Sequence, residues 1–164
     1  MEQRKKFSIT VYLALLALSG CGRLEQNGQY DEDGYKILGT LAGKKLSPGQ
    51  VAYLVREAGF AEDAVGKMVC TAEYESSHYT EARNVNQNNS VDIGLFQINT
   101  INWKWCTNKT GEEAENILKD ATKNVACALL VAGGKDAPYL TRWFGYKKNK
   151  EKCDAYKAPK SQTI

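Results

Sequence analysis

Two carboxyl-bearing residues, Glu75 and Asp92, lie seventeen positions apart in the stretch from Cys70 to Asn99. Glu75 ends a segment with helical apolar periodicity, and Asp92 follows a polar turn. Cleavage of a glycosidic bond needs two carboxyl groups in different environments, one that keeps its proton near neutral pH and one that stays ionised. The stretch supplies such a pair, which is the strongest functional signal in the chain.

The elements around this pair must hold the two side chains in place. Ser47-Pro48 is typical of a helix start, with serine as the cap and proline at the first helical position, and this helix is expected to end near Gly59. Apolar residues of 62–76 recur at helical spacing. This periodicity predicts a second helix that carries Glu75 at its C-terminal end.

The remaining elements follow from turn formers and periodicity. Residues 83–92 are rich in asparagine and predict a turn, and residues 91–99 are expected to form a strand after a hairpin. A third helix is expected over 112–132, either continuous or interrupted once. An aromatic segment is expected over 139–153, and the tail from residue 154 is expected to fray. The pattern predicts an α+β fold, mostly helical with a small antiparallel β-hairpin subdomain.

The first twenty residues have the features of an export signal. A basic start is followed by a short apolar run that ends at Leu18-Ser19-Gly20. Cys21 directly after this run resembles the bacterial lipoprotein signal, which implies lipidation of Cys21 and attachment of the chain to a membrane. An ordinary exported protein with an unmodified cysteine is the alternative. Residues 21–45 are polar and glycine-rich and predict a flexible tether.

Charge and cysteine content narrow the function further. From Cys21 onward there are nineteen basic and eighteen acidic residues, so charge alone indicates neither general polyanion binding nor a nucleic-acid partner. Four cysteines remain besides Cys21, which in an exported chain indicates two disulfides with three possible pairings. A zinc site is disfavoured by the cysteine spacing and by the presence of only one histidine, His78. The four cysteines are Cys70, Cys106, Cys127 and Cys153.

The block from Cys70 to Asn99 resembles the c-type lysozymes in residue type and in spacing. The matching residues are Cys70, Glu75, Ser76, Thr80, Ala82, Asn84, Asn86, Ser90, Asp92, Gly94, Leu95, Gln97, Ile98 and Asn99. A looser match runs from Leu46 to Cys153 through Trp105-Cys106, Val125-Ala126-Cys127 and Trp143-Phe144-Gly145-Tyr146. The resemblance implies a lysozyme-like catalytic domain over residues 46–155, with a tail over 156–164.

The resemblance also implies roles for individual residues. Glu75 is the expected general acid and Asp92 the nucleophile or charge stabiliser of a retaining glycoside hydrolase acting on peptidoglycan, between N-acetylmuramic acid and N-acetylglucosamine. The implied disulfides are Cys70–Cys153 and Cys106–Cys127. No metal or other cofactor is expected. The residues expected to support Asp92 or to contact the sugars are Asn84, Gln97, Asn99, Trp103, Trp105 and Trp143.

The chain departs from the family pattern in three places. Its domain has four cysteines where the family usually has eight, and the bridge that joins the chain ends is missing. About two extra residues lie between Thr100 and Trp105, and Cys153 comes three residues later than expected after the aromatic segment. The lysine-rich run over 147–152 is expected to be a solvated helix face. The alternative is that it helps to bind an acidic wall polymer.

Two other readings of the same residues stay open. Lytic transglycosylases also combine Glu-Ser with a later Gly-Leu-x-Gln motif, but they use a single glutamate and form an anhydro-sugar without consuming water. A protein of lysozyme fold can also bind peptidoglycan without cleaving it. Asp92 and the cysteine pattern favour the hydrolase. The lipoprotein signal places it in the cell envelope, facing the periplasm or anchored in the outer membrane.

Overall fold

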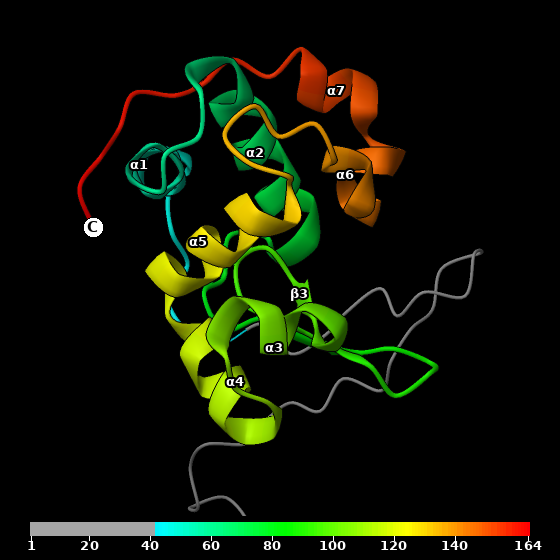
Figure 1. The fold of residues 1–164 in the computed structure, drawn as a ribbon. Coiled ribbons are helices and arrows are strands. Elements are labelled where there is room, and N and C mark those ends of the chain that lie inside the picture. The colour runs from blue at the N-terminus through cyan, green and yellow to red at the C-terminus, as the bar shows by residue number, and fades with distance from the viewer. Residues whose placement is uncertain (1–41) are drawn as a thin grey trace, which may run out of the picture.

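A computed structural model describes residues 42–164 of the chain; the expected signal peptide, Cys21 and most of the tether lie outside these residues. Helix α2 is central and packs against α1, α6 and α7, whereas α3, α4 and the small sheet lie at the other end of the molecule (Figure 1). The α+β class is confirmed. The elements are α1 (Pro48–Glu57), α2 (Glu62–Ser76), β1 (Arg83–Val85), β2 (Val91–Ile93), β3 (Ile98–Asn99), α3 (Thr100–Thr107), α4 (Gly111–Lys119), α5 (Ala121–Val131), a 3-10 turn (Leu140–Arg142), α6 (Phe144–Lys148) and α7 (Lys150–Asp154).

Helices α1 and α2 begin and end close to where local sequence predicts. Ser47 and Gln50 form a reciprocal capping box at the start of α1, which satisfies backbone N–H groups that the first turn leaves free. Helix α2 starts with two acidic residues, which are favourable at the positive end of the helix dipole. It ends where Ser77 adopts a left-handed conformation, so Glu75 lies in its last turn.

The sheet has three antiparallel strands in the order β1-β2-β3, with Asn84 opposite Asp92 and Asp92 opposite Asn99. The single strand expected over 91–99 is wrong, because residues 94–97 form a turn that splits it into β2 and β3. Gly94 and Gln97 both have positive φ, 79° and 45°, which ends the extended conformation. This turn folds β3 back onto β2 and brings Asn99 beside Asp92.

The helices after the sheet are shorter than expected. The predicted helix over 112–132 is interrupted at Asp120, which ends α4 and then caps α5 by accepting a hydrogen bond from the Lys123 N–H. Helix α3 was not expected at all. It follows β3 without a loop, because the Asn99 side chain caps its first turn at Ile101.

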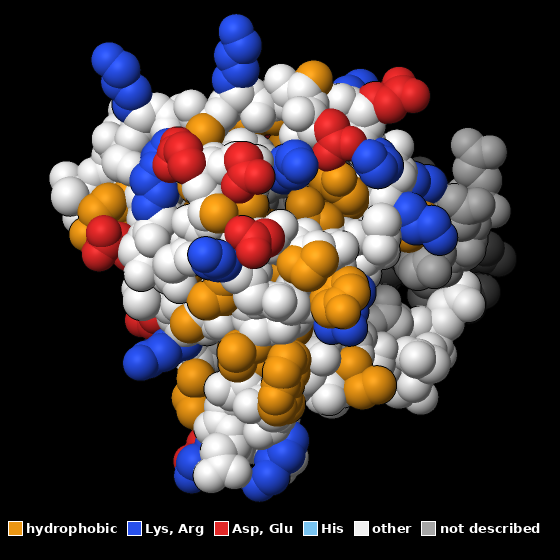
Figure 2. Space-filling view, turned by 45° about the horizontal axis from the view of Figure 1, so that its top comes forward, with side chains coloured by type: hydrophobic (Ala, Val, Ile, Leu, Met, Phe, Trp, Pro, Cys, Tyr) orange, Lys and Arg blue, Asp and Glu red, His pale blue; other side chains and the backbone are white. Residues whose placement is uncertain are grey.

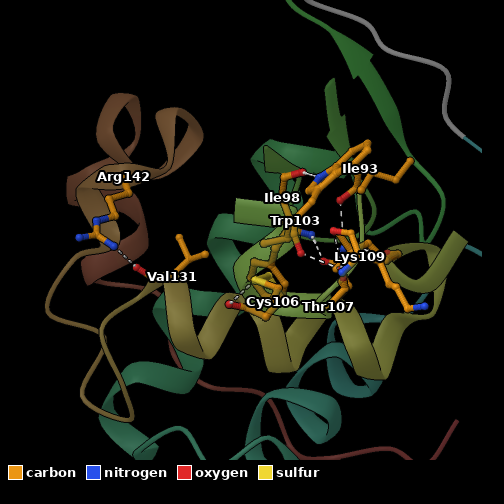
Figure 3. The surroundings of a disulfide bond; sticks show 12 residues. Ile93, Ile98, Trp103, Cys106, Thr107, Lys109, Val131 and Arg142 are labelled. Atoms are coloured by element: carbon orange, nitrogen blue, oxygen red, sulfur yellow. Dashed lines mark hydrogen bonds between the residues drawn. A yellow bond between two sulfur atoms is a disulfide. The ribbon is translucent and has the colours of Figure 1, made fainter. Parts of the chain in front are cut away.

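Two disulfides tie the helices together, in the pairing that the family resemblance implies. Cys70–Cys153 joins α2 to α7, and Cys106–Cys127 joins α3 to α5. Figure 3 shows the second bridge with Trp103 beside it on α3. The Trp103 indole is buried and donates a hydrogen bond to the Ile98 carbonyl (2.8 Å), which anchors α3 to β3.

The C-terminal tail does not fray; it lies along α1 and α2. Gln162 exchanges hydrogen bonds with the Gly49 carbonyl and the Ser47 hydroxyl, and Arg56 donates to the Pro159 carbonyl. The tail also crosses α2 so closely that a Cβ at Gly66 would lie 2.2 Å from the Tyr156 carbonyl oxygen. The tail thus brings the C-terminus to the start of α1, although no disulfide joins the ends of this domain.

A chain that ends at Ala158 is expected to lose about 1–3 kcal/mol of unfolding free energy, because each lost hydrogen bond contributes about 0.5–1.5 kcal/mol and several are partly exposed. Urea denaturation measures the loss. Removal of Ile164 alone is the control, since its side chain is exposed. Equal midpoints for the full and shortened chains would show that the tail contacts contribute nothing.

The end of the expected tether belongs to the folded domain. Residues 42–46 run antiparallel to 78–81, with Leu46 N–H donating to the His78 carbonyl and Thr80 N–H to the Lys44 carbonyl.

Within residues 42–164 no helix has the length and apolar character needed to cross a membrane. On the face drawn in Figure 2, basic and acidic side chains are interspersed.

Candidate active site

Glu75 faces the start of helix α6. The Gly145 backbone N–H donates a hydrogen bond to Glu75 Oε1 at 2.7 Å, across seventy positions of sequence. A Cβ on Gly145 would lie 2.8 Å from the same oxygen, so the absence of a side chain permits this approach. The disulfide Cys70–Cys153 and the contacts of α2 with α6 hold the two segments together.

The surroundings of Glu75 favour its protonated form. Burial raises the pKa of the carboxyl from 4.5 to about 7; the Gly145 hydrogen bond opposes this shift, and the negative charge of Asp92 adds to it. Desolvation is the largest cause, because a charged carboxylate loses more hydration on burial than a neutral acid does. Glu75 therefore holds a proton near neutral pH and is able to donate it.

Asp92 lies in the middle of β2 and is surrounded by side-chain amides. Asn99 Nδ2 donates to Asp92 Oδ1 (2.7 Å), and Asn86 Nδ2 donates to Asp92 Oδ2 (2.8 Å). Asn84 Nδ2 makes a longer contact with Oδ2 (3.4 Å). Both carboxylate oxygens accept N–H donors, and such bonds stabilise a carboxylate and fix its orientation.

Asn84 and Asn99 thus support Asp92, and the structure adds two residues that were not expected to do so, Asn86 and Ser90. The Ser90 hydroxyl oxygen accepts hydrogen bonds from both Asn86 and Asn99, so the two amides are themselves oriented. Cross-strand pairing explains why Asn84 and Asn99 lie beside Asp92, since each stands opposite it on a neighbouring strand. The turn between β1 and β2 places Asn86, which could have been found from the asparagine spacing alone.

The pair combines a protonated acid with an ionisable group fixed by amides. This is the arrangement that acid-assisted glycosidic bond cleavage requires, one group to protonate the leaving oxygen and one to face the developing positive charge. In residues 42–164 no group of three or more His, Cys, Asp and Glu side chains could hold a metal ion.

Comparison with known proteins identifies the lineage. The model of the C-type lysozyme/alpha-lactalbumin family matches residues 49–158. The chain belongs to this family.

Several relatives show how far the likeness extends. Lysozyme-like protein 1 of Mus musculus is 34% identical over 99 residues, covering 56% of this chain and 64% of its own length. Lysozyme c-1 of Anopheles gambiae is 31% identical over 122 residues, covering 71% and 81%. The crystal structure of a lysozyme from Litopenaeus vannamei has 30% identity and a TM-score of 0.52, covering 66% of this chain and 90% of that one. As a member of the c-type lysozymes, the chain is a glycoside hydrolase.

The three tryptophans of this lysozyme-family chain have different surroundings. The prediction that Trp103 stacks on a sugar ring at the rim of the site is wrong. Its indole is only 4% exposed, and its N–H donates to the Ile98 carbonyl. Trp143 is equally buried, so its expected contact with the sugars is wrong as well. Its N–H donates to the Phe96 carbonyl (2.7 Å), and its ring meets the Phe96 ring edge-on. Trp105 is 58% exposed and remains available for a sugar ring.

Gln97 and Asn124 fix the turn between β2 and β3. The Gln97 side-chain amide donates to the carbonyls of Ala82 and Gly94 (both 2.9 Å), which is a structural role, and its predicted sugar contact remains a prediction. Asn124 on α5 is fully buried, donates to the Ile93 and Leu118 carbonyls and accepts from the Phe96 N–H. Asn124 directly precedes the apolar run 125–131 of α5, and this position of an asparagine was the signal that sequence reasoning missed.

Replacing Asn86 with alanine is expected to lower kcat roughly tenfold or more while the protein stays folded, because a hydrogen bond to a charged group contributes about 1.5–3 kcal/mol. Steady-state kinetics on a soluble wall fragment measures the change. Asn88→Ala is the control in the same turn, since the Asn88 side chain is exposed and accepts a hydrogen bond from the Ser90 N–H rather than bonding Asp92. Equal rates for wild type and Asn86→Ala would remove Asn86 from the support of Asp92.

Proposed function

We propose that this protein is a muramidase that hydrolyses the β-1,4 bond between N-acetylmuramic acid and N-acetylglucosamine in peptidoglycan. The observation that carries the proposal is the contrast between the two carboxyl groups. Glu75 is partly buried, its carboxyl is bonded to the Gly145 N–H, and desolvation raises its pKa to about 7, whereas Asp92 is held by three asparagine amides. Family membership supports peptidoglycan as the substrate.

The reaction follows from these two environments. Glu75 donates its proton to the glycosidic oxygen, which leaves as the hydroxyl of the departing sugar. Asp92 faces the anomeric carbon and either stabilises its positive charge or forms a bond to it. Glu75, now a carboxylate, takes a proton from water as the water oxygen attacks that carbon, and both carboxyl groups return to their starting state. Attack from the face of the leaving group retains the configuration.

The hydrogen bonds to Asp92 support hydrolysis over the single-acid alternative. Asn86 and Asn99 are positioned by Ser90 and hold both oxygens of Asp92, so this carboxylate is an oriented group. A transglycosylase that uses Glu75 alone would have no need of such an oriented carboxylate. Products of a purified wall digest decide between the two, because the transglycosylase product lacks one water.

The rate is expected to fall as pH rises through about 7. Glu75 must hold a proton to act as the acid, and above its pKa of about 7 the protonated fraction drops tenfold per pH unit. The measurement is kcat/KM against pH on a soluble oligosaccharide, which reports the free enzyme. A rate that falls already near pH 4.5, or that stays level to pH 9, would contradict the environment assigned to Glu75.

We further propose that the protein acts at the cell envelope from a lipid anchor on Cys21. The order of basic start, apolar run and Leu-Ser-Gly-Cys supports this proposal. The intact mass of the membrane-associated protein tests it, with a diacylated N-terminal cysteine expected. Release of wild type and Cys21→Ser into the soluble fraction to the same extent would exclude the anchor.

A further inference from the structure

Positive charge is concentrated at the C-terminal end of the described domain. Residues 142–160 contain seven lysine and arginine residues against two acidic residues, whereas residues 42–141 contain ten against twelve. The segment includes helices α6 (Phe144–Lys148) and α7 (Lys150–Asp154). The positive charge of the described domain is therefore concentrated on these two helices and the residues that follow them.

This segment is fixed next to the catalytic acid. The Gly145 N–H at the start of α6 binds Glu75, and Lys147 follows two positions later. Cys153 in α7, beside Lys152, is bonded to Cys70 on α2, the helix that carries Glu75. The lysines are thus mounted on two short helices that cannot move far from the active site.

Two of these lysines lack an ion-pair partner among the residues that the structure describes. Lys150 pairs with Asp154, and the Lys148 ammonium lies 4.8 Å from the centre of the Phe144 ring. Lys147 and Lys152 are exposed, and neither forms an ion pair within residues 42–164. Two of the acids of α2 already have partners, because Glu62 pairs with Arg56 and Glu73 with His78.

From this arrangement we infer that α6 and α7 form a binding surface for the carboxylates of the peptides attached to the glycan strand, with Lys147 and Lys152 as its main contacts. The inference rests on the proposed function, since those peptides are attached to the muramic acid residues of the proposed substrate. Because the Gly145 N–H of α6 contacts Glu75 at 2.7 Å, a glycan strand that reaches Glu75 comes close to α6, and its peptide carboxylates are expected within reach of the exposed ammonium groups. Lysines suit this role because attraction between mobile, hydrated charges tolerates peptides of varied conformation.

Binding of insoluble peptidoglycan tests the inference independently of cleavage. Lys147→Gln combined with Lys152→Gln is placed in the Glu75→Gln background and compared with Glu75→Gln alone by co-sedimentation. Two weakened surface pairs are expected to raise the half-saturating wall concentration about three- to tenfold. Removal of the peptides with an amidase is expected to abolish the difference in half-saturating wall concentration between the two proteins. A higher salt concentration is expected to reduce that difference.

The control variant, Lys123→Gln combined with Lys135→Gln, changes net charge equally on exposed lysines outside the segment. An equal loss of binding in the control would show a general charge effect and overturn the inference. A loss that persists on peptide-free glycan, or no loss at all, would also overturn it. So would a variant that binds wall normally but no longer binds vesicles of phosphatidylglycerol and phosphatidylcholine, which would assign the surface to a membrane.

Failure of the proposed function would look different. In that case the protein with Glu75 intact releases no fragments from either peptide-bearing or peptide-free wall, whatever the binding results. If it does cleave, the double lysine variant is expected to raise KM on peptide-bearing fragments by a similar factor, with kcat unchanged. An unchanged KM on those fragments would contradict the placement of the surface beside the reacting strand.

Discussion

Replacing Glu75 with glutamine is expected to lower the rate of wall cleavage by at least 10²- to 10⁴-fold, the usual contribution of a positioned general acid. Glutamine keeps the shape of the side chain and can still accept the Gly145 hydrogen bond, but it has no proton to donate. The folded structure should therefore persist while the chemistry stops. Initial rates on a soluble wall fragment measure the loss.

The same substitution is expected to stabilise the protein above neutral pH. The pKa of Glu75 is raised from 4.5 to about 7 in the folded state, so below pH 4.5 the group is neutral in both states and costs nothing. Between these values the unfolded chain loses the proton first, and stability falls as pH rises, by roughly 3 kcal/mol in all. Glutamine avoids this loss, so urea midpoints for the variant should match wild type at pH 4 and exceed it at pH 8.

Glu57→Gln is the matched control, because Glu57 is exposed on α1. It should change neither the rate nor the pH dependence of stability. Full activity in Glu75→Gln would exclude Glu75 as the acid. A variant that is inactive but no more stable than wild type at pH 8 would show that burial does not raise the pKa of this carboxyl.

Replacing Asp92 with asparagine is expected to lower the hydrolysis rate by about 10²- to 10³-fold, the range seen when a preorganised electrostatic partner of the transition state is removed. The variant also loses the negative charge that raises the pKa of Glu75. The residual activity should therefore decline with rising pH at a lower pH than in wild type. Rate against pH for both proteins provides both readouts.

Asp136→Asn is the control for this second substitution, because Asp136 is exposed in the loop after α5. Retained cleavage in Asp92→Asn, with products lighter by one water, would assign the protein to the single-acid transglycosylases. Loss of both cleavage and thermal stability would instead indicate that asparagine disrupts the amide cluster. Asp92→Glu then distinguishes loss of the negative charge from loss of the side-chain geometry, since it keeps the carboxylate but lengthens the side chain.

Local rules were sufficient for the elements that carry Glu75. Helices α1 and α2 have their starts in the Ser47-Pro48 cap and in the acidic first turn of α2, and these signals act within a few residues. The two carboxyl groups were also predictable, since their spacing and neighbours lie in one block of thirty residues. Such features depend little on the rest of the fold.

Contacts between distant segments were not predictable in this way. The burial of Trp103 depends on β3, and the bond from Gly145 to Glu75 spans seventy positions. The tail was expected to fray because chain termini are commonly poorly ordered, yet Arg56 and Gly49 on α1 supply partners for it. In each case tertiary contacts override what the local sequence favours.

The most direct test is the mass of the products that the purified protein releases from peptidoglycan. Hydrolysis by the pair of Glu75 and Asp92 predicts fragments that end in an ordinary reducing muramic acid, and their loss in Glu75→Gln. Fragments lighter by one water would contradict the role of Asp92 and establish a transglycosylase. No fragments from either acetylated or deacetylated wall would contradict the assignment of a muramidase altogether.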